Sequence, residues 1–380
     1  MGPYQSAVIR IGFAGTWLFF LLREFPHRHE LYGPDGPWSF ALAERLIASN
    51  GAFSVLMWSD STVWFEILYA VAVLASVGLL LGWRTRATSV LFMVGVLSLQ
   101  NRSVFMGDGG DNVIHLMAVY LVLTRCAQVW SVDARRARLR GTASAGAAGP
   151  ALWAVLGAVL AYGAVTGRFS TGWLVAFAAV WVVCGLWWLV DRHDPEGEGR
   201  ATLDVLANLL HNAGMLVIMA EVCLIYATAG WYKIQGSRWQ DGTALYYPLG
   251  LDYFTPWPGL SALLASSGTL VMLLSYGTVA VQVAFPFTVF NRRIKNALLA
   301  LMMLEHVGIA VLLGLPFFSL AMIAADAVFL PTGFLVWLGA RVAWRRRRAE
   351  PEPVPVVGPR GPAPQTPAGL KGAGAGAAVD

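Results

Sequence analysis

Eight ionisable side chains lie inside long apolar stretches or at their ends, where a charge needs a partner or a function. Carboxylic acids, imidazoles and amines are also the groups that most often transfer protons in enzymes. These residues are therefore the first candidates for chemistry. They are Glu66, His115, His211, Glu221, Lys233, Glu305, His306 and Asp326.

Lys233 is the most informative of them, because the chain contains only three lysines against 24 arginines. It ends an apolar stretch directly after Trp231 and Tyr232. An arginine cannot release its proton near neutral pH, whereas a lysine that is partly removed from water can. Lys233 is thus a candidate general base. The same pattern is equally typical of an interfacial anchor, in which aromatic rings and a snorkelling amine hold a helix end at the membrane surface.

The composition indicates the elements that must position these groups. Of the 380 residues, 57% are hydrophobic and 13% are charged, whereas a soluble domain carries about 25% charged residues. The repeated apolar runs predict an all-α polytopic membrane helix bundle with about ten spans, within a range of eight to ten. The ten expected spans are 7–22, 63–81, 87–99, 113–129, 152–165, 173–190, 203–229, 269–290, 294–313 and 316–337.

The basic residues predict the topology of these spans. When the connecting segments are assigned alternately to two sides, sixteen Lys and Arg residues fall on one side and seven on the other. The positive-inside rule makes the first side cytoplasmic, which places both termini inside the cell. Two long loops, 23–62 and 230–268, then lie outside. The second is rich in Trp, Tyr and Pro, and we expect it to pack over the bundle or at the membrane interface.

Two regions of the chain differ in composition. Residues 1–344 form the predicted transmembrane domain, whereas residues 349–380 are rich in Pro, Ala and Gly and predict a disordered cytoplasmic tail.

The basic residues lie in short loops, so the net charge of +5 indicates membrane topology and no nucleic-acid partner. No pattern typical of metal ligands occurs. Membrane lipid is the expected surrounding, and no feature indicates an oligomeric state.

The predicted topology also sorts the ionisable groups by depth. Glu66 and His115 lie in the first turn below the outer surface, where hydration is an equally good explanation for them. Glu221 lies about 12 Å below the outer end of its span, and Glu305 and His306 lie near the midplane. These groups and Lys233 are expected to approach one another in the outer half of the bundle. His211 lies too near the cytoplasmic side, and Asp326 has no evident partner.

Three stretches resemble the HTTM (horizontally transferred transmembrane) family, the bacterial relatives of the membrane domain of vitamin K-dependent gamma-glutamyl carboxylase. The first two are Asn101-Arg-Ser-Val-Phe-Met-Gly-Asp-Gly-Gly-Asp-Asn112 and Trp130-Ser-Val-Asp133, and the third is Ala229-Gly-Trp-Tyr-Lys-Ile-Gln-Gly-Ser-Arg-Trp239. The Phe285-Pro286 pair and His306 also fall where the family has a Phe-Pro and a His. The resemblance covers residues 10–331 and implies a multi-pass protein of the bacterial plasma membrane.

The resemblance implies a mechanism. A lysine at the position of Lys233 acts as the base on the hydroquinone form of vitamin K, oxygen then yields a strongly basic quinone species, and CO2 adds to a deprotonated glutamate. Menaquinol or a vitamin K hydroquinone-like quinol, O2 and CO2 are therefore the expected reactants, with no metal. The chain departs from the carboxylase at Tyr232, where a second lysine stands, and at Ile309, where an Asn stands. Gln282 replaces an acid that relatives often carry. The large lumenal domain that grips the carboxylase's peptide is absent.

These observations lead to two hypotheses from different classes. The first is a carboxylase-like membrane enzyme that acts on a quinol and is coupled to the modification of an exported peptide. The alternative is a non-catalytic membrane partner in the maturation, export or immunity of a small secreted peptide. The predicted catalytic residues are Lys233, His306, Glu221 and Glu305, and the predicted substrate pocket is formed by Asp111, Asn112, His115, Trp231, Tyr232 and Trp239.

Overall fold

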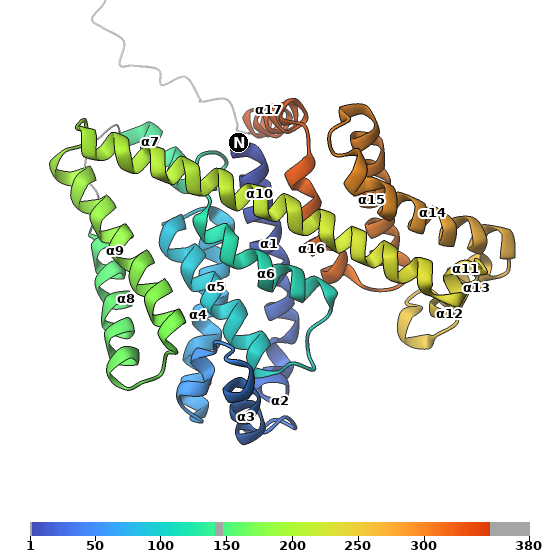
Figure 1. The fold of residues 1–380 in the computed structure, drawn as a ribbon, viewed down its shortest axis with the longest axis horizontal. Helices are drawn as coiled ribbons and strands as arrows, with labels where there is room; N and C mark the ends of the chain where they lie inside the picture. The colour runs from blue at the N-terminus through green and yellow to red at the C-terminus, as the bar shows by residue number, and fades with distance from the viewer. Residues whose placement is uncertain (1, 141–146, 350–380) are drawn as a thin grey trace, which may run out of the picture. The chain divides into compact units, whose positions relative to one another are not determined.

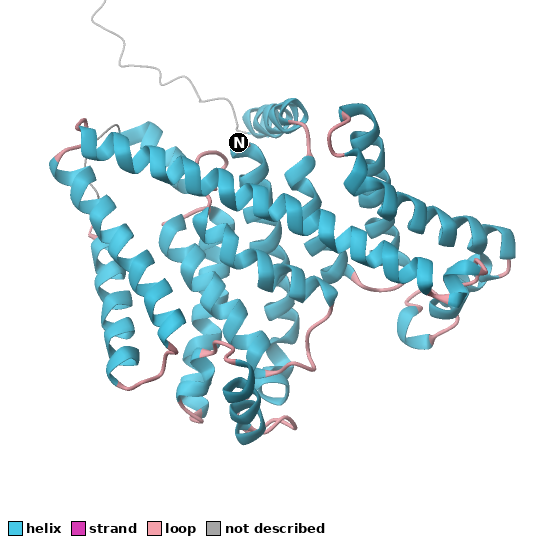
Figure 2. Cartoon of the chain, viewed as in Figure 1, coloured by secondary structure: helices cyan, strands magenta, loops and turns pink. Residues whose placement is uncertain are grey.

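A computed structural model describes residues 2–140 and 147–349, and every regular element within these ranges is helical (Figure 2). The all-α prediction is therefore confirmed. The predicted disordered tail, residues 349–380, begins at the last described residue, Ala349, which ends a helix. Residues 350–380 lie outside the described part of the chain. The long helices are α1 (Pro3–Glu24), α4 (Thr62–Leu81), α5 (Thr85–Arg102), α6 (Gly109–Leu123), α8 (Ala148–Val165), α9 (Thr171–His193), α10 (Glu198–Gln235), α14 (Gly268–Thr288), α15 (Arg292–Leu312), α16 (Pro316–Asp326) and α17 (Thr332–Ala349).

Shorter helices fill the connections between these long ones. The Arg-rich segment after α6 contains helix α7 (Val132–Arg140). Both predicted outer loops also contain helical turns. These are η1 (Phe25–His27), α2 (Arg28–Tyr32), α3 (Phe40–Asn50) and η2 (Val55–Trp58) in the first, and α11 (Ser237–Gln240), α12 (Tyr246–Leu249), η3 (Asp252–Phe254) and α13 (Pro258–Ala265) in the second.

All ten expected spans coincide with helical residues, although the fourth ends early and the tenth is broken. Within the described ranges, seven helices are long and apolar enough to cross a membrane, or eight if the pair 316–329 and 332–342 counts as one broken span. The tenth expected span breaks because Pro331 follows Leu330, and a residue before proline favours the extended conformation that Leu330 adopts. The fourth ends at Leu123, six residues earlier than expected, and its 15 residues are short for a span.

The chain divides into two compact units, residues 1–336 and 337–380. In the first unit, α1 packs against α4 and α16, α5 packs against α4 and α6, and α10 packs against α6 and α14 (Figure 1). The hydrophobic core includes Phe13 and Trp17 of α1, Phe92 of α5, and Met117 of α6. In the second unit, the guanidinium of Arg341 lies 4.6 Å from the ring centroid of Trp337.

One buried arginine ties three segments of the first unit together. The guanidinium of Arg10 donates to the carbonyl oxygens of Leu79 and Leu80 at the end of α4, and to those of Cys126 and Trp130 after α6. Four backbone acceptors satisfy a charge that would otherwise be costly to bury. The connection between α6 and α7 is therefore held against the N-terminal part of α1, which is the cytoplasmic end in the predicted topology.

The Trp-Ser-Val-Asp motif has a structural explanation of its own. The carboxylate of Asp133 accepts hydrogen bonds from the backbone N–H of Arg84 at 3.0 Å and of Thr85 at 2.8 Å, and from the Thr85 hydroxyl at 2.8 Å. Arg84 has a positive φ of 47°, so the turn between α4 and α5 is tight. Asp133 thus caps the start of α5 from a distant part of the chain.

We expect Asp133→Ala to lower the free energy of unfolding by about 1–2 kcal/mol, because it removes the acceptor of two backbone N–H groups at a helix start. Thermal unfolding in detergent micelles measures this change. Asp60→Ala is the control, since Asp60 is exposed and its replacement is expected to be neutral. Equal melting temperatures for the two variants would show that the Asp133 cap adds no stability.

Candidate functional site

The long helix α10 presents one continuous stripe of inward-facing residues. Apart from the adjacent pair Gly214 and Met215, its buried positions recur every three or four residues, as one face of a helix requires. They are His211, Gly214, Met215, Ile218, Val222, Tyr226 and Gly230. Lys233 follows Gly230 by three residues and continues the same face in half-buried surroundings. Tyr226 and Lys233 are therefore two turns apart on one face, about 10 Å along the axis.

Lys233 lies at one end of a hydrogen-bonded chain of three side chains. Its Nζ donates to Oε1 of Gln282 on α14 at 2.8 Å, and Nε2 of Gln282 donates to Oε1 of Glu305 on α15 at 2.7 Å. The Lys233 amine also lies 5.3 Å from the ring centroid of Trp239. Gln282 stands between the amine and the carboxylate, so the amine contacts a neutral acceptor and an aromatic ring.

Gly230 allows this contact by letting α10 and α14 approach closely. A Cβ atom added at Gly230 would lie 2.6 Å from Cγ2 of Val283 and 3.3 Å from the Val283 backbone nitrogen. Val283 directly follows Gln282, so the separation of the two helices at this point sets the distance from Gln282 to Lys233. The glycine of the Ala-Gly pair therefore has a packing role beside the candidate base.

A pair of Gly→Ala substitutions tests this close approach. We expect Gly230→Ala to destabilise the protein by about 1–3 kcal/mol through overpacking. Gly277→Ala, in the middle of α14, meets open space and is expected to stabilise by up to ~1 kcal/mol, since alanine is the better helix former. Thermal unfolding should therefore show a lower melting temperature for Gly230→Ala and a higher one for Gly277→Ala than for the wild type. A stabilising Gly230→Ala would contradict the tight α10–α14 contact.

A second cluster consists of three fully buried side chains from α10, α15 and α16. The hydroxyl of fully buried Tyr226 lies 3.0 Å from Nε2 of His306 on α15, and 3.1 Å and 3.0 Å from the two carboxylate oxygens of Asp326 at the end of α16. All three side chains are at most 2% exposed. The expectation that Asp326 lacks a partner is therefore wrong, because its carboxylate accepts from the Tyr226 hydroxyl.

The three groups of the second cluster can hold one mobile proton in two arrangements. In the first, the Tyr226 hydroxyl donates to the Asp326 carboxylate and accepts from Nε2–H of His306. In the second, a protonated Asp326 donates to the phenol oxygen, and the phenol donates to Nε2 of His306. In the described part of the chain, Nδ1 of His306 has no hydrogen-bond partner. With Nδ1 of His306 protonated throughout, going from the first arrangement to the second shifts one proton along the chain from His306 to Asp326.

The two clusters meet on α15 without merging. Glu305 and His306 are adjacent in sequence, about 100° apart around the helix, so they face different partners. Glu305 joins the Lys233 cluster and His306 joins the Tyr226 cluster. The structure thus brings three of the four predicted catalytic residues onto neighbouring faces of α10 and α15.

Glu221, the fourth, lies apart from both clusters. The Tyr120 hydroxyl on α6 donates to its carboxyl group, and Oε2 of Glu221 has no hydrogen-bond partner among the described residues. Glu221 is five residues before Tyr226 and therefore points to a different side of α10. It faces α6, whereas Lys233 faces α14.

The residues predicted for a substrate pocket are dispersed. Trp239 lies next to Lys233, whereas Trp231 and Tyr232 are 61% and 72% exposed. Asp111 accepts from the backbone N–H of Asp108 and closes the capping box that begins α6. Asn112 is exposed and His115 is half-buried on α6. Of this set, the structure places Trp239 at the Lys233 cluster.

The other ionisable candidates have local partners. Nδ1 of His211 accepts from the backbone N–H of Arg125 at 3.1 Å, which agrees with its exclusion from the outer cluster. Glu66 pairs with Arg28 at 2.8 Å and with His29 at 2.6 Å near the first outer loop. Within residues 2–140 and 147–349, no group of three or more His, Cys, Asp or Glu side chains is arranged to hold a metal ion.

Tyr226, Gln282 and Asp326 are the polar residues that sequence reasoning did not assign to the site. Tyr226 opens the stretch that contains Lys233, seven residues before it, and this helical spacing was the available signal. Gln282 was singled out only as a departure from the family pattern. Asp326 is 100 residues from Tyr226, so only the folded structure reveals their contact.

Comparison with known protein families, curated proteins and solved structures finds no match for this chain. The likeness to the HTTM family therefore rests on the sequence motifs and remains a prediction.

Proposed function

We propose that the protein is a carboxylase-like integral membrane enzyme of the HTTM type that acts on a membrane quinol, with Lys233 as the base. The quinol, menaquinol or a vitamin K hydroquinone-like molecule, supplies two acidic hydroxyl groups and two electrons for a reaction with O2. In this proposal the oxidised product is used to modify an exported peptide with CO2.

The observation that carries the proposal is the surroundings of the Lys233 amine. The amine is half-buried and hydrogen-bonded to the amide oxygen of Gln282. An amide oxygen can accept a hydrogen bond from an ammonium group and also from a neutral amine, so this contact orients the amine in both states. A directly bound carboxylate would instead favour the charged state. Among the described residues, no carboxylate forms an ion pair with Lys233.

The other side chains support a base at this position. The Trp239 indole beside the amine offers an aromatic face of the kind against which a quinone ring stacks. Glu305 holds Gln282 from its far side and thereby fixes which amide atom faces Lys233. Glu305 is thus a positioning residue in this proposal. His306, Tyr226 and Asp326 form a buried hydrogen-bonded group that can hold one proton. It lies on the neighbouring face of α15 from Glu305.

Quinone binding beside Trp239 tests the proposal before any chemistry is measured. Menaquinone titrated into purified protein should quench tryptophan fluorescence saturably, and Trp239→Phe should remove a distinct part of the quenched signal. Trp188→Phe is the control, because Trp188 lies on α9 beside Arg192, away from the Lys233 cluster. Identical quenching of the two variants would place the quinone elsewhere and contradict the proposed site.

The second candidate function, a non-catalytic partner of a secreted peptide, is favoured by the second outer loop. α11 and α13 of this loop pack against α14, yet Tyr253 and Trp257 remain 85% and 59% exposed. Exposed aromatic side chains of this kind suit a docking surface or a membrane interface. Such a partner needs no base, so Lys233→Arg would leave it functional.

A further inference from the structure

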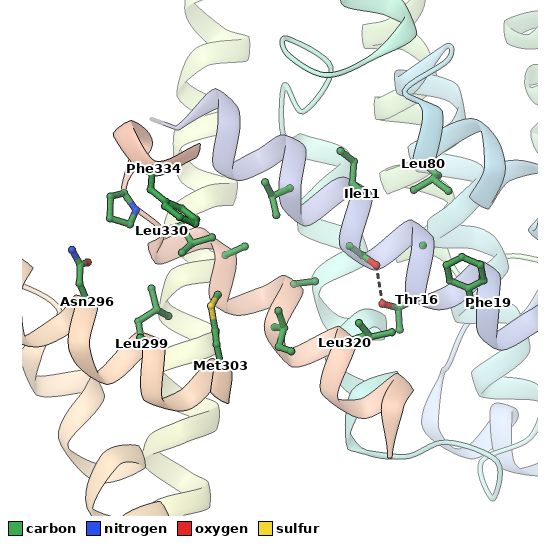
Figure 3. Close-up of a pocket in the computed structure, with 18 residues that line it drawn as sticks. Ile11, Thr16, Phe19, Leu80, Asn296, Leu299, Met303, Leu320, Leu330 and Phe334 are labelled. Carbon is green, nitrogen blue, oxygen red and sulfur yellow. Dashed lines mark hydrogen bonds between the residues drawn. The ribbon is translucent and has the colours of Figure 1, made fainter. Parts of the chain in front are cut away.

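An apolar groove of about 710 Å³ opens between α1, α15 and α16, with residues 330–334 at one end (Figure 3). Thr16 and Asn296 are the only polar residues among the 18 that line it. The Thr16 hydroxyl is already satisfied, because it donates to the Gly12 carbonyl at 2.8 Å. The groove wall therefore offers hydrocarbon along its length and a polar side chain, Asn296, at one end.

The groove is accessible from the outside of the bundle. Phe19, Leu320 and Phe334 line it and are each about half exposed. Apolar side chains exposed on a membrane-spanning helix face lipid tails. None of the lining residues takes part in the Lys233 or Tyr226 clusters, so the groove is separate from the proposed catalytic site.

The dimensions of the groove match one lipid tail. From Val8 to Phe19, α1 rises about 16 Å at ~1.5 Å per residue, which is about half of the ~30 Å hydrocarbon thickness of a bilayer. A groove of this length reaches from the membrane surface to the midplane, the depth of one leaflet. Its volume also lies within the usual range for a ligand site, roughly 300–1,000 Å³.

Charge distinguishes the two ends of the groove. At the Asn296 end, Arg292 and Arg293 precede Asn296 by one helical turn and are exposed. Neither forms an ion pair with a described carboxylate. At the Phe19 end, Arg23 follows one turn later on α1 and is paired with Glu24 at 3.3 Å. The net positive end is also the cytoplasmic end of the predicted topology, where the leaflet is rich in anionic lipids.

We propose that this groove seats one acyl chain of an anionic phospholipid from the cytoplasmic leaflet, with the phosphate held by Arg292 and Arg293. Arginine suits this task because its planar guanidinium binds phosphate through two parallel hydrogen bonds. Asn296 lies between the guanidinium groups and the hydrocarbon wall, where the glycerol esters of such a lipid need a hydrogen-bond donor.

Native mass spectrometry of the full chain tests the proposal, after exchange into detergent with equal amounts of phosphatidylglycerol and phosphatidylcholine of identical chains. The wild-type protein should retain one phosphatidylglycerol molecule. Ala300→Trp fills the groove from an exposed position on α15 and should lower retention at least about tenfold, since losing the burial of two methylenes already has that effect. Ala297→Trp, exposed on the same helix but outside the groove, should retain the lipid.

The headgroup is tested separately. The double variant R292Q/R293Q should lower the preference for phosphatidylglycerol by about fivefold per arginine, while the double variant R135Q/R138Q on α7 should keep it. Ala300→Phe replaces Ala300→Trp if circular dichroism shows that the tryptophan variant is not folded. Equal retention in Ala300→Trp and Ala297→Trp would overturn the groove as the site. Equal retention of the two lipids by the wild type, or displacement of phosphatidylglycerol by menaquinone, would overturn an anionic phospholipid as its occupant.

Discussion

Replacing Lys233 with arginine is expected to lower the rate of quinol oxidation at least about 100-fold, because a positioned general base contributes roughly 10²–10⁴ in rate. Arginine keeps the positive charge and the length needed to anchor a helix end at the interface. It cannot release its proton near neutral pH, so it cannot accept one from a quinol hydroxyl. The substitution therefore separates the two interpretations of the Trp-Tyr-Lys pattern.

The measurement is quinol consumption by purified variants in lipid vesicles under air. Lys295→Arg is the matched control, because Lys295 also lies at a helix end and its amine donates to the Phe329 carbonyl, an anchoring contact that arginine can replace. We expect this control to retain wild-type activity. If Lys233→Arg oxidises quinol as fast as Lys295→Arg, then Lys233 is an anchor and not the base.

Removing the Tyr226 hydroxyl is expected to have the largest effect on stability. In Tyr226→Phe, the Asp326 carboxyl and Nε2 of His306 both lose their shared partner while remaining buried. Leaving a buried polar group unpaired costs about 1–3 kcal/mol, and more for a charged one. Two such groups should lower the free energy of unfolding by about 3 kcal/mol or more.

Unfolding in mixed micelles, followed by circular dichroism as denaturing detergent is added, measures this loss. Tyr162→Phe is the control, since Tyr162 is 58% exposed on α8 and its hydroxyl serves no buried group. The second substitution should be close to neutral. A Tyr226→Phe variant as stable as Tyr162→Phe would mean that the three groups do not depend on one another.

The helices were predictable because apolar length and Gly or Pro breaks determine them locally. Each of the ten expected spans falls on helical residues, and the tenth breaks at Pro331. The expected span continued from α6 to Val129, although Thr124, Arg125 and Gln128 are polar and interrupt the apolar run after Leu123. Asp133 and Arg10 hold that connection instead, through contacts with α4 and α5.

The site was only partly predictable, for a related reason. Depth along the spans suggested that Lys233 and Glu305 approach one another, but it did not reveal Gln282 of α14 between them. Rotation about each helix decides which side chains meet, and rotation depends on packing, as the Gly230–Val283 contact shows. Depth also suggested that Glu221 belonged to the site, whereas its position on α10 turns it toward Tyr120.

The most direct test of the central claim is whether the protein oxygenates a membrane quinol. Purified wild-type protein in vesicles containing menaquinol is incubated under ¹⁸O₂, and the quinone fraction is analysed by mass spectrometry. The account predicts an oxidised quinone product that carries ¹⁸O, formed in wild-type protein and lost in Lys233→Arg. Quinol loss equal to that in protein-free vesicles, with no ¹⁸O in the product, would contradict it.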